Sequence, residues 1–183
     1  MDLILIIGAI ALVALFLISQ YNKLIRLNVQ VDEAFAQIEV QLQRRADLIP
    51  NLVETVKGYA SHEREAFEKV TEARAKSQSA NGIADIAAAD NMLTQALRGL
   101  LAVAEAYPDL KASANFIQLQ EELSTTENKV AFSRQFYNDS VRTLNTAVKT
   151  VPTNFFAGFA KVGEREFYEV DDPTARSVPK VNF

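Results

Sequence analysis

The chain has 183 residues and a formal net charge of −4. The 23 acidic residues outnumber the 19 basic residues, so the chain lacks the excess of positive charge that binding to a nucleic acid requires. It contains no cysteine, which excludes disulfides, thiolate metal sites and a catalytic thiol. Six glycines and five prolines are few, and the remaining residues are rich in good helix formers, so the sequence predicts an all-α protein.

Residues 3–22 carry no charge, and residues 3–18 are all apolar or glycine. At about 1.5 Å per residue, a helix over this stretch spans about 30 Å, the thickness of a bilayer's hydrocarbon core. A cleaved signal peptide is disfavoured because Met1 and Asp2 supply no positive charge and no small-residue cleavage site follows Ile18. A buried core helix is the other alternative, but the stretch is apolar all round. We predict a membrane anchor.

The charges that follow the anchor suggest its orientation. Lys23, Arg26, Arg44 and Arg45 come after the span, and positive charge favours the cytoplasmic side. We therefore expect a single-pass protein of the cell (inner) membrane with its N-terminus outside and its soluble part in the cytoplasm. Only Lys23 and Arg26 lie close to the span, so the opposite orientation stays open.

The apolar spacing becomes helical after the anchor. Leu24, Val31, Ile38 and Leu42 follow the i, i+3/i+4 pattern of a one-sided stripe, and no helix breaker separates them from the anchor. We expect the membrane helix to continue into the first soluble helix and to end near Arg45.

Three more helices are predicted. A turn and restart at residues 47–50, with proline in a first helical turn, begins a second helix over 48–80. The turn dipeptide Asn81-Gly82 precedes a third helix over 83–106, which ends before Pro108. A fourth helix over 113–151 ends at Pro152. The matched lengths of the second and fourth helices favour an elongated antiparallel four-helix bundle with these two as its spine.

The pattern changes after Pro152, where three phenylalanines gather at Phe155, Phe156 and Phe159. They either cap the core or lie in the bilayer interface if the chain turns back to the membrane. The predicted organisation is an anchor over 1–22, a helical bundle over 23–170 and a polar tail over 171–183.

No residue pattern predicts catalysis, a metal or a cofactor. His62-Glu63 begins a zinc-protease pattern, but Ala66 stands where the second histidine must be. The adjacent carboxylate pairs in predicted helices point about 100° apart and cannot easily share a proton. No phosphate-binding glycine loop or nucleophile motif is present.

Some polar residues interrupt the apolar seams or border aromatic residues, and we regard them as candidate contacts. A buried polar layer, with Glu127 paired to Arg44 or Arg45, and a solvent-facing arrangement remain equally open. The polar candidates are Arg44, Arg45, Glu127, Asn128, Arg134 and Asn138. The phenylalanine cluster is a further candidate.

Several segments resemble the bacterial LemA family, in the same order and over nearly the whole chain. They are 41–53 (QLQRRADLIPNLV), 56–63 (VKGYASHE), 107–111 (YPDLK), 126–130 (TENKV), 134–138 (with Arg134, Phe136, Tyr137 and Asn138) and 151–154 (VPTN). The resemblance implies one N-terminal membrane helix followed by a long antiparallel helical bundle. It implies no established enzyme activity, and a relative in magnetotactic bacteria is associated with magnetosome membrane formation.

These observations together predict a non-enzymatic scaffold that is held in the lipid bilayer, assembles into a homo-oligomer, and organises or shapes the membrane. The alternative is an adaptor for a membrane protease or another membrane-protein partner, which the resemblance implies because family members are often encoded near such proteins.

Overall fold

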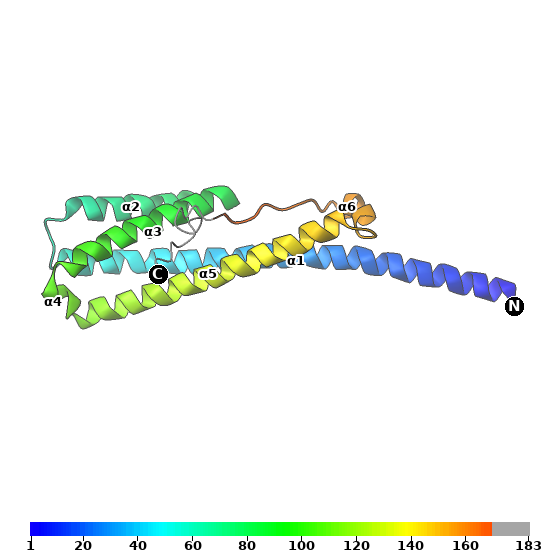
Figure 1. Ribbon diagram of the computed structural model, residues 1–183, viewed down its shortest axis with the longest axis horizontal. Coiled ribbons are helices and arrows are strands. Elements are labelled where there is room, and N and C mark those ends of the chain that lie inside the picture. The colour runs from blue at the N-terminus through cyan, green and yellow to red at the C-terminus, as the bar shows by residue number, and fades with distance from the viewer. Residues whose placement is uncertain (170–183) are drawn as a thin grey trace, which may run out of the picture. The chain divides into compact units, whose positions relative to one another are not determined.

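The computed structural model describes residues 1–169, and every regular element in this range is a helix. The prediction of an all-α protein is therefore confirmed. The helices are α1 (Asp2–Lys57), α2 (Arg64–Ser79), α3 (Ile83–Glu105), α4 (Pro108–Lys111), α5 (Ala114–Lys149) and α6 (Asn154–Ala160) (Figure 1).

Helix α1 contains the whole apolar stretch and continues beyond it without a break. None of the apolar window that is long enough to cross a membrane is buried inside the chain. This exposure contradicts the alternative of a buried core helix and fits a single-pass membrane protein. The expected continuation of the anchor into a soluble helix is confirmed.

The predicted end of this helix near Arg45 is wrong, because α1 passes through Pro50 and ends at Lys57. Proline at position 50 cannot donate a backbone hydrogen bond to the carbonyl of Ala46, one turn earlier. That carbonyl instead accepts a hydrogen bond from Nε of Arg74 on α2, at 2.9 Å. The long-range partner satisfies the group that proline leaves unpaired, so the helix continues.

The predicted second helix over 48–80 is also wrong, because the chain turns between Lys57 and Arg64. Backbone N–H groups of Tyr59 and Ala60 close this turn on the carbonyl of Val56, at 3.1 and 2.9 Å. The Ala60 side chain is small enough to pack in the core at the turn, where it is buried. Because α2 has only 16 residues, it does not match α5 in length, and the predicted pairing of a second and fourth helix as the spine fails.

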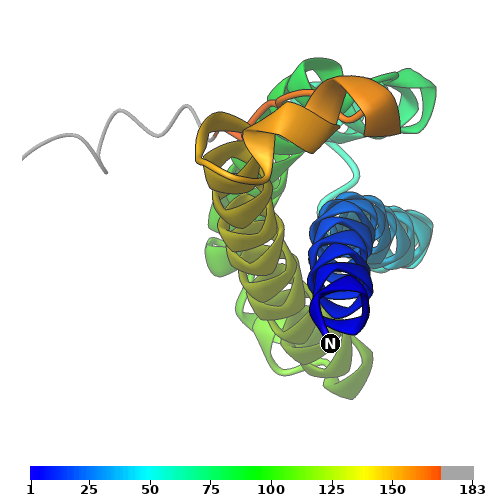
Figure 2. The same ribbon diagram turned by 90° about the vertical axis from the view of Figure 1, so that its right-hand side faces the viewer.

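The other helices lie close to their predicted positions. Gly82 adopts a positive φ of 83° before α3, a conformation that glycine accepts without strain. Helix α3 ends at Glu105, ahead of Pro108, and Pro108 then begins the short α4. Helix α5 ends before Pro152, as expected. The phenylalanine cluster forms an unpredicted helix, α6, which turns away from the end of α5 (Figure 2).

The described chain forms two compact units, and α1 and α5 contribute to both. The first unit comprises Met1–Glu39 and Ala131–Phe167. Here the buried residues of α1 and α5 form the core. The ring centroids of Phe35 on α1 and Tyr137 on α5 lie 5.8 Å apart. The buried residues are Leu24, Val31, Ala34 and Ile38 on α1, and Tyr137, Val141, Leu144 and Ala147 on α5.

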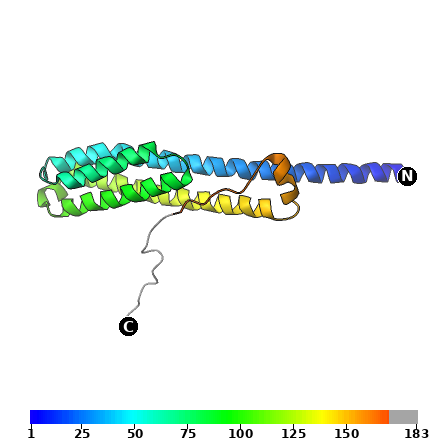
Figure 3. The same cartoon turned by 90° about the horizontal axis from the view of Figure 1, so that it is seen from above.

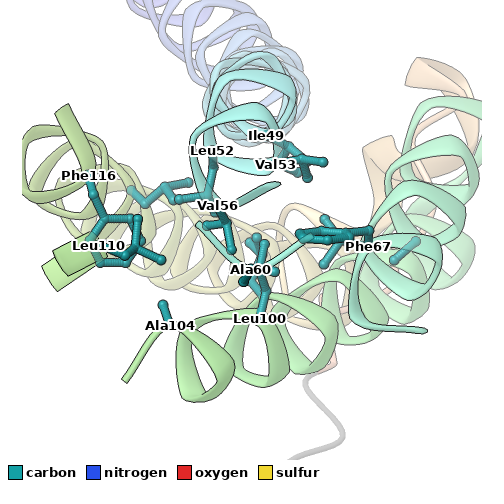
Figure 4. Close-up of a cluster of buried hydrophobic side chains, with 14 of the residues drawn as sticks. Ile49, Leu52, Val53, Val56, Ala60, Phe67, Leu100, Ala104, Leu110 and Phe116 are labelled. Carbon is teal, nitrogen blue, oxygen red and sulfur yellow. The ribbon is translucent and has the colours of Figure 1, made fainter. Parts of the chain in front are cut away.

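The second unit comprises Val40–Val130 and the chain from Tyr168. Helices α2 and α3 lie side by side in it, joined by residues 80–82 (Figures 1 and 3). Side chains from α1, α2, α3, α4 and α5 point into a common apolar core (Figure 4). Each fully buried leucine or valine contributes about 1.5–3 kcal/mol relative to exposure to water. The predicted polar tail over 171–183 lies outside the described residues.

Candidate functional site

A buried ion pair lies within the second unit. Nη1 of Arg45 on α1 is 2.9 Å from Oδ1 of Asp90 on α3, and the two side chains are 2% and 1% exposed. The same Nη1 donates to Oγ1 of Thr94 at 2.9 Å. The hydroxyl of Tyr168 donates to the other carboxylate oxygen of Asp90 at 3.0 Å. The carboxylate is thus held by a cation on one oxygen and a phenol on the other.

This network holds α1, α3 and Tyr168 together. Removing one member of a buried pair leaves an uncompensated charge, which costs far more than an exposed ion pair contributes. The Arg45–Asp90 pair therefore specifies how α1 and α3 pack.

The sequence singled out Arg45, with Glu127 as a partner in one of two arrangements left open, but it did not identify Asp90 or Tyr168. Asp90 continues the core spacing of α3, three residues before Leu93 and seven before Leu97. A carboxylate at a core position needs a buried cation, and this was the signal that could have found it.

Of the two arrangements left open for Glu127, the structure has the one that faces solvent. Glu127 and Asn128 are exposed, and Thr126 occupies the buried position between Leu123 and Val130. Oγ1 of Thr126 donates to the carbonyl of Glu122 at 2.8 Å, which satisfies the hydroxyl locally. Arg44 is exposed as well. Arg44, Glu127 and Asn128 are thus available to a partner, whereas Arg45 is not.

A second polar arrangement holds residues 162–167, the strap, within the first unit. The side chain of Asn145 on α5 donates to the carbonyl of Arg165 at 2.9 Å and accepts from its N–H at 2.8 Å. The hydroxyl of Tyr137 donates to the carbonyl of Glu166 at 2.8 Å. The guanidinium of Arg165 pairs with Asp32 on α1. The strap thus has both its backbone and its side chains bound by the two long helices.

Burial raises the pKa of Tyr137 to about 12, and the nearby Glu166 carboxylate adds to this shift. The phenol therefore stays protonated and keeps donating to the strap. Arg134 and Asn138, which the sequence singled out beside this tyrosine, are half-buried and have interactions within the chain.

The three phenylalanines of α6 differ in exposure. Phe155 is 68% exposed and Phe159 is 85% exposed, whereas Phe156 is half-buried. The alternative in which the cluster caps the core is therefore wrong for Phe155 and Phe159. Together with the buried Thr153 and Val162, this gives α6 one packed side and one exposed apolar side.

Residues 1–169 contain no cluster of histidine, aspartate and glutamate that is suited to a metal ion. His62 is exposed in the turn before α2. An open groove of about 700 Å³ lies along α2 and α3. It is lined by the apolar residues and glycine Ala66, Met92, Ala96, Gly99 and Val103 and by the polar residues Glu63, Glu65, Lys69, Glu72 and Gln95.

The chain matches one protein-family model and several named proteins in sequence. The LemA family model matches residues 34–183. Protein LemA of Metamycoplasma hominis is 27% identical over 143 residues, which cover 76% of this chain and 64% of that protein. Magnetosome protein MamQ of Magnetospirillum gryphiswaldense is 26% identical over 192 residues, covering 88% and 71%. Magnetosome protein MamQ 2 of Paramagnetospirillum magneticum is 22% identical over 194 residues, covering 91% and 71%. The chain thus spans about two thirds of the length of these relatives.

Proposed function

Because the chain belongs to the LemA family, we propose that it is a non-enzymatic, membrane-anchored scaffold that self-assembles and organises or shapes the membrane. The observation that carries this proposal is the continuity of α1. The same helix supplies the exposed apolar stretch and then the buried stripe that begins at Leu24. A contact between copies inside the bilayer is therefore transmitted to the folded first unit, and the reverse also holds. Relatives named as magnetosome proteins support a role at a membrane.

Exposed apolar residues on the soluble segments support self-assembly. Phe132 and Phe136 lie one helical turn apart on α5 and are 72% and 44% exposed. On α1, Val29 is 46% exposed and Val40 is 63% exposed. Large exposed apolar side chains close together on one helix favour contact with another protein surface. We propose that in the assembled state this α5 face contacts a second copy, and that the helices form a long antiparallel four-helix bundle.

The proposed orientation puts the folded units in the cytoplasm. Lys23 and Arg26 follow the apolar stretch within the range over which basic residues are retained on the cytoplasmic side. A membrane-impermeant maleimide tests the orientation on an Asn128→Cys variant in intact cells, since the natural chain has no cysteine. Labelling only after the membrane is opened supports the orientation, and labelling of intact cells contradicts it.

Disulfide cross-linking tests self-assembly, because in a chain without cysteine a single introduced thiol can link only two different molecules. We expect Phe132→Cys and Leu12→Cys to give cross-linked dimers in native membranes at natural expression. Ala131→Cys is the matched control, since Ala131 is exposed but lies about 100° round the same helix. Monomers alone for both test variants, or equal cross-linking at Ala131, would contradict a specific assembly.

The groove along α2 and α3 favours the second candidate function, an adaptor for a membrane protease or another membrane protein. Its small residues Ala66, Ala96 and Gly99 would let a partner's helix approach closely. A Cβ atom at position 99 would meet no neighbouring atom within 4 Å, so we expect Gly99→Leu to enter the groove without disturbing the fold. Loss of a co-purifying membrane protein in this variant, with self-cross-linking intact, would favour the adaptor. Identical co-purifying proteins would count against it.

A further inference from the structure

The outer face of α6 and of the turn before it is apolar and unpartnered within the described chain. Phe155 and Phe159 lie one helical turn apart on α6 and are 68% and 85% exposed. Val151, in the turn before the helix, is 70% exposed. Both ends of the helix are held, because the flanking residues Thr153 and Val162 are buried, and Phe156 is half-buried. The element therefore exposes two aromatic rings on α6 and a valine in the turn before it.

This face lies level with the end of the apolar stretch of α1. Thr150 and Thr153, just before α6, line a groove of about 330 Å³ together with Lys23 and Leu27 of α1. Lys23 is the first charged residue after the membrane stretch. Figures 1 and 3 both show α6 (orange) beside the place where α1 begins to extend on its own toward the N-terminus. At this depth the hydrocarbon core gives way to lipid headgroups.

The charges around α6 suit the headgroup layer. Lys23, Arg26 and Lys161 are exposed, and none of them takes part in an ion pair identified within residues 1–169. Basic side chains at this level attract anionic lipid headgroups. Exposed phenylalanines of a helix that lies on the membrane surface enter the boundary between headgroups and acyl chains.

We propose that α6 is a second, interfacial membrane attachment, in which Val151, Phe155 and Phe159 enter the bilayer surface next to the anchor. The occupant of this apolar face is the lipid bilayer, with anionic headgroups contacting Lys23, Arg26 and Lys161. Two attachments on one rigid unit fix the tilt and the rotation of α1, which a lone transmembrane helix does not. The inference rests on the proposed function only in requiring that α1 spans the membrane.

Tryptophan fluorescence of the full chain in vesicles tests this proposal. The natural chain has no tryptophan, so Phe159→Trp provides one probe at an exposed site that leaves the core intact. Phe132→Trp is the matched control, because Phe132 is 72% exposed and belongs to the same unit. Both variants are reconstituted in vesicles of phosphatidylcholine and phosphatidylglycerol, with or without bromine on the upper acyl chains.

An interfacial helix lies about 5–10 Å into the boundary, so we expect bromolipid to remove about half or more of the emission of Phe159→Trp. The emission of Phe132→Trp should be insensitive to bromolipid. Phe155→Trp gives an independent second measurement on the same face. Circular dichroism verifies that each variant retains the helix content of the natural chain.

Three results would overturn the proposal. The first is equal bromolipid quenching of Phe159→Trp and Phe132→Trp. The second is free quenching of Phe159→Trp by aqueous iodide without any effect of bromolipid. The third is shielding from both quenchers, which would mean that α6 contacts a second copy and not lipid. Cross-linking of Phe132→Cys in the same vesicles reports self-assembly separately, so failure of one proposal is distinguishable from failure of the other.

Discussion

At the scale of single residues, a buried charge pair lies within the mostly apolar described core of the second unit. Arg45 and Asp90 join α1 to α3, and Tyr168 ties the chain after the strap to the same carboxylate. A buried pair of this kind contributes less to net stability than to uniqueness of packing, since the desolvation of both charges offsets their attraction. The free energy of unfolding falls most when only one of the two charges is removed, because the other charge then stays buried without a partner.

Replacing Asp90 by alanine should destabilise the chain by about 3–5 kcal/mol, because it leaves the buried Arg45 guanidinium without its anion. The double variant Arg45→Met with Asp90→Leu should recover most of this loss, since no unpaired charge remains. Helix content against guanidinium concentration, measured in mild detergent, gives both values. Glu65→Ala, which breaks an exposed ion pair on α2, is the control and should leave the midpoint unchanged. A double variant no more stable than Asp90→Ala would contradict the role assigned to the pair.

Tyr137 predicts how stability depends on alkaline pH. Its pKa is raised from 10.0 to about 12, chiefly by burial. Because the unfolded chain ionises near pH 10 and the folded chain only near 12, the neutral phenol stabilises the fold below pH 10, and this contribution is lost as pH rises through about 12. The difference in phenolate absorbance between the natural chain and Tyr137→Phe should therefore show a midpoint near pH 12. A midpoint near 10 with full helix content would show that the phenol is not buried.

At the scale of helices, the sequence predicted α3 and α5 well because their ends are set by local signals. Asn81-Gly82 and Pro152 act on their own neighbours, and an apolar stripe fills the interval between them. The passage of α1 through Pro50 could not be predicted in this way. It depends on Arg74 in another helix, and only the folded structure brings the Arg74 side chain to the carbonyl of Ala46.

The same limit applies to the candidate site. The exposed phenylalanines and Arg44 were recognisable as unusual residues in their local sequence. Which of the adjacent residues Arg44 and Arg45 is buried depends on where Asp90 lies on another helix. The sequence therefore identified Arg45 as a candidate but could not predict its burial or its partner. For the strap, the partner of the Asn145 side chain is backbone, which carries no sequence signal.

A double-variant cycle tests how α1 passes through its proline. Arg74→Met removes the donor to the buried Ala46 carbonyl and should cost about 1–3 kcal/mol. In a Pro50→Ala background the cost should be smaller, because residue 50 regains an N–H that can bond the same carbonyl. Lys69→Met on the same helix is the control, since Lys69 is exposed and pairs only locally. Equal costs of Arg74→Met in both backgrounds would rule out this explanation.

At the scale of the whole molecule, the proposed assembly requires α1 to act as one element from the bilayer into the first unit. Ser19 and Gln20 lie at the end of the membrane stretch, and no glycine or proline interrupts the helix there. A flexible tether would let the folded units drift independently of contacts in the membrane. A continuous helix does not.

Glycine at both Ser19 and Gln20 should uncouple the two regions, because each glycine in a helix interior costs about 1 kcal/mol relative to alanine. In this background the cross-link at Phe132→Cys should fall, while the cross-link at Leu12→Cys within the bilayer persists. Alanine at both positions is the control and should preserve both cross-links. If the glycine pair leaves both unchanged, α1 does not transmit assembly.

The most direct test of the central proposal is the mass of the particle that the chain forms in its own lipids. Single-particle mass measurement after extraction of native membranes with a lipid-retaining polymer, at natural expression, reads this without a chemical cross-linker. The scaffold predicts particles that contain several copies of the chain. Particles that contain one copy only would contradict self-assembly.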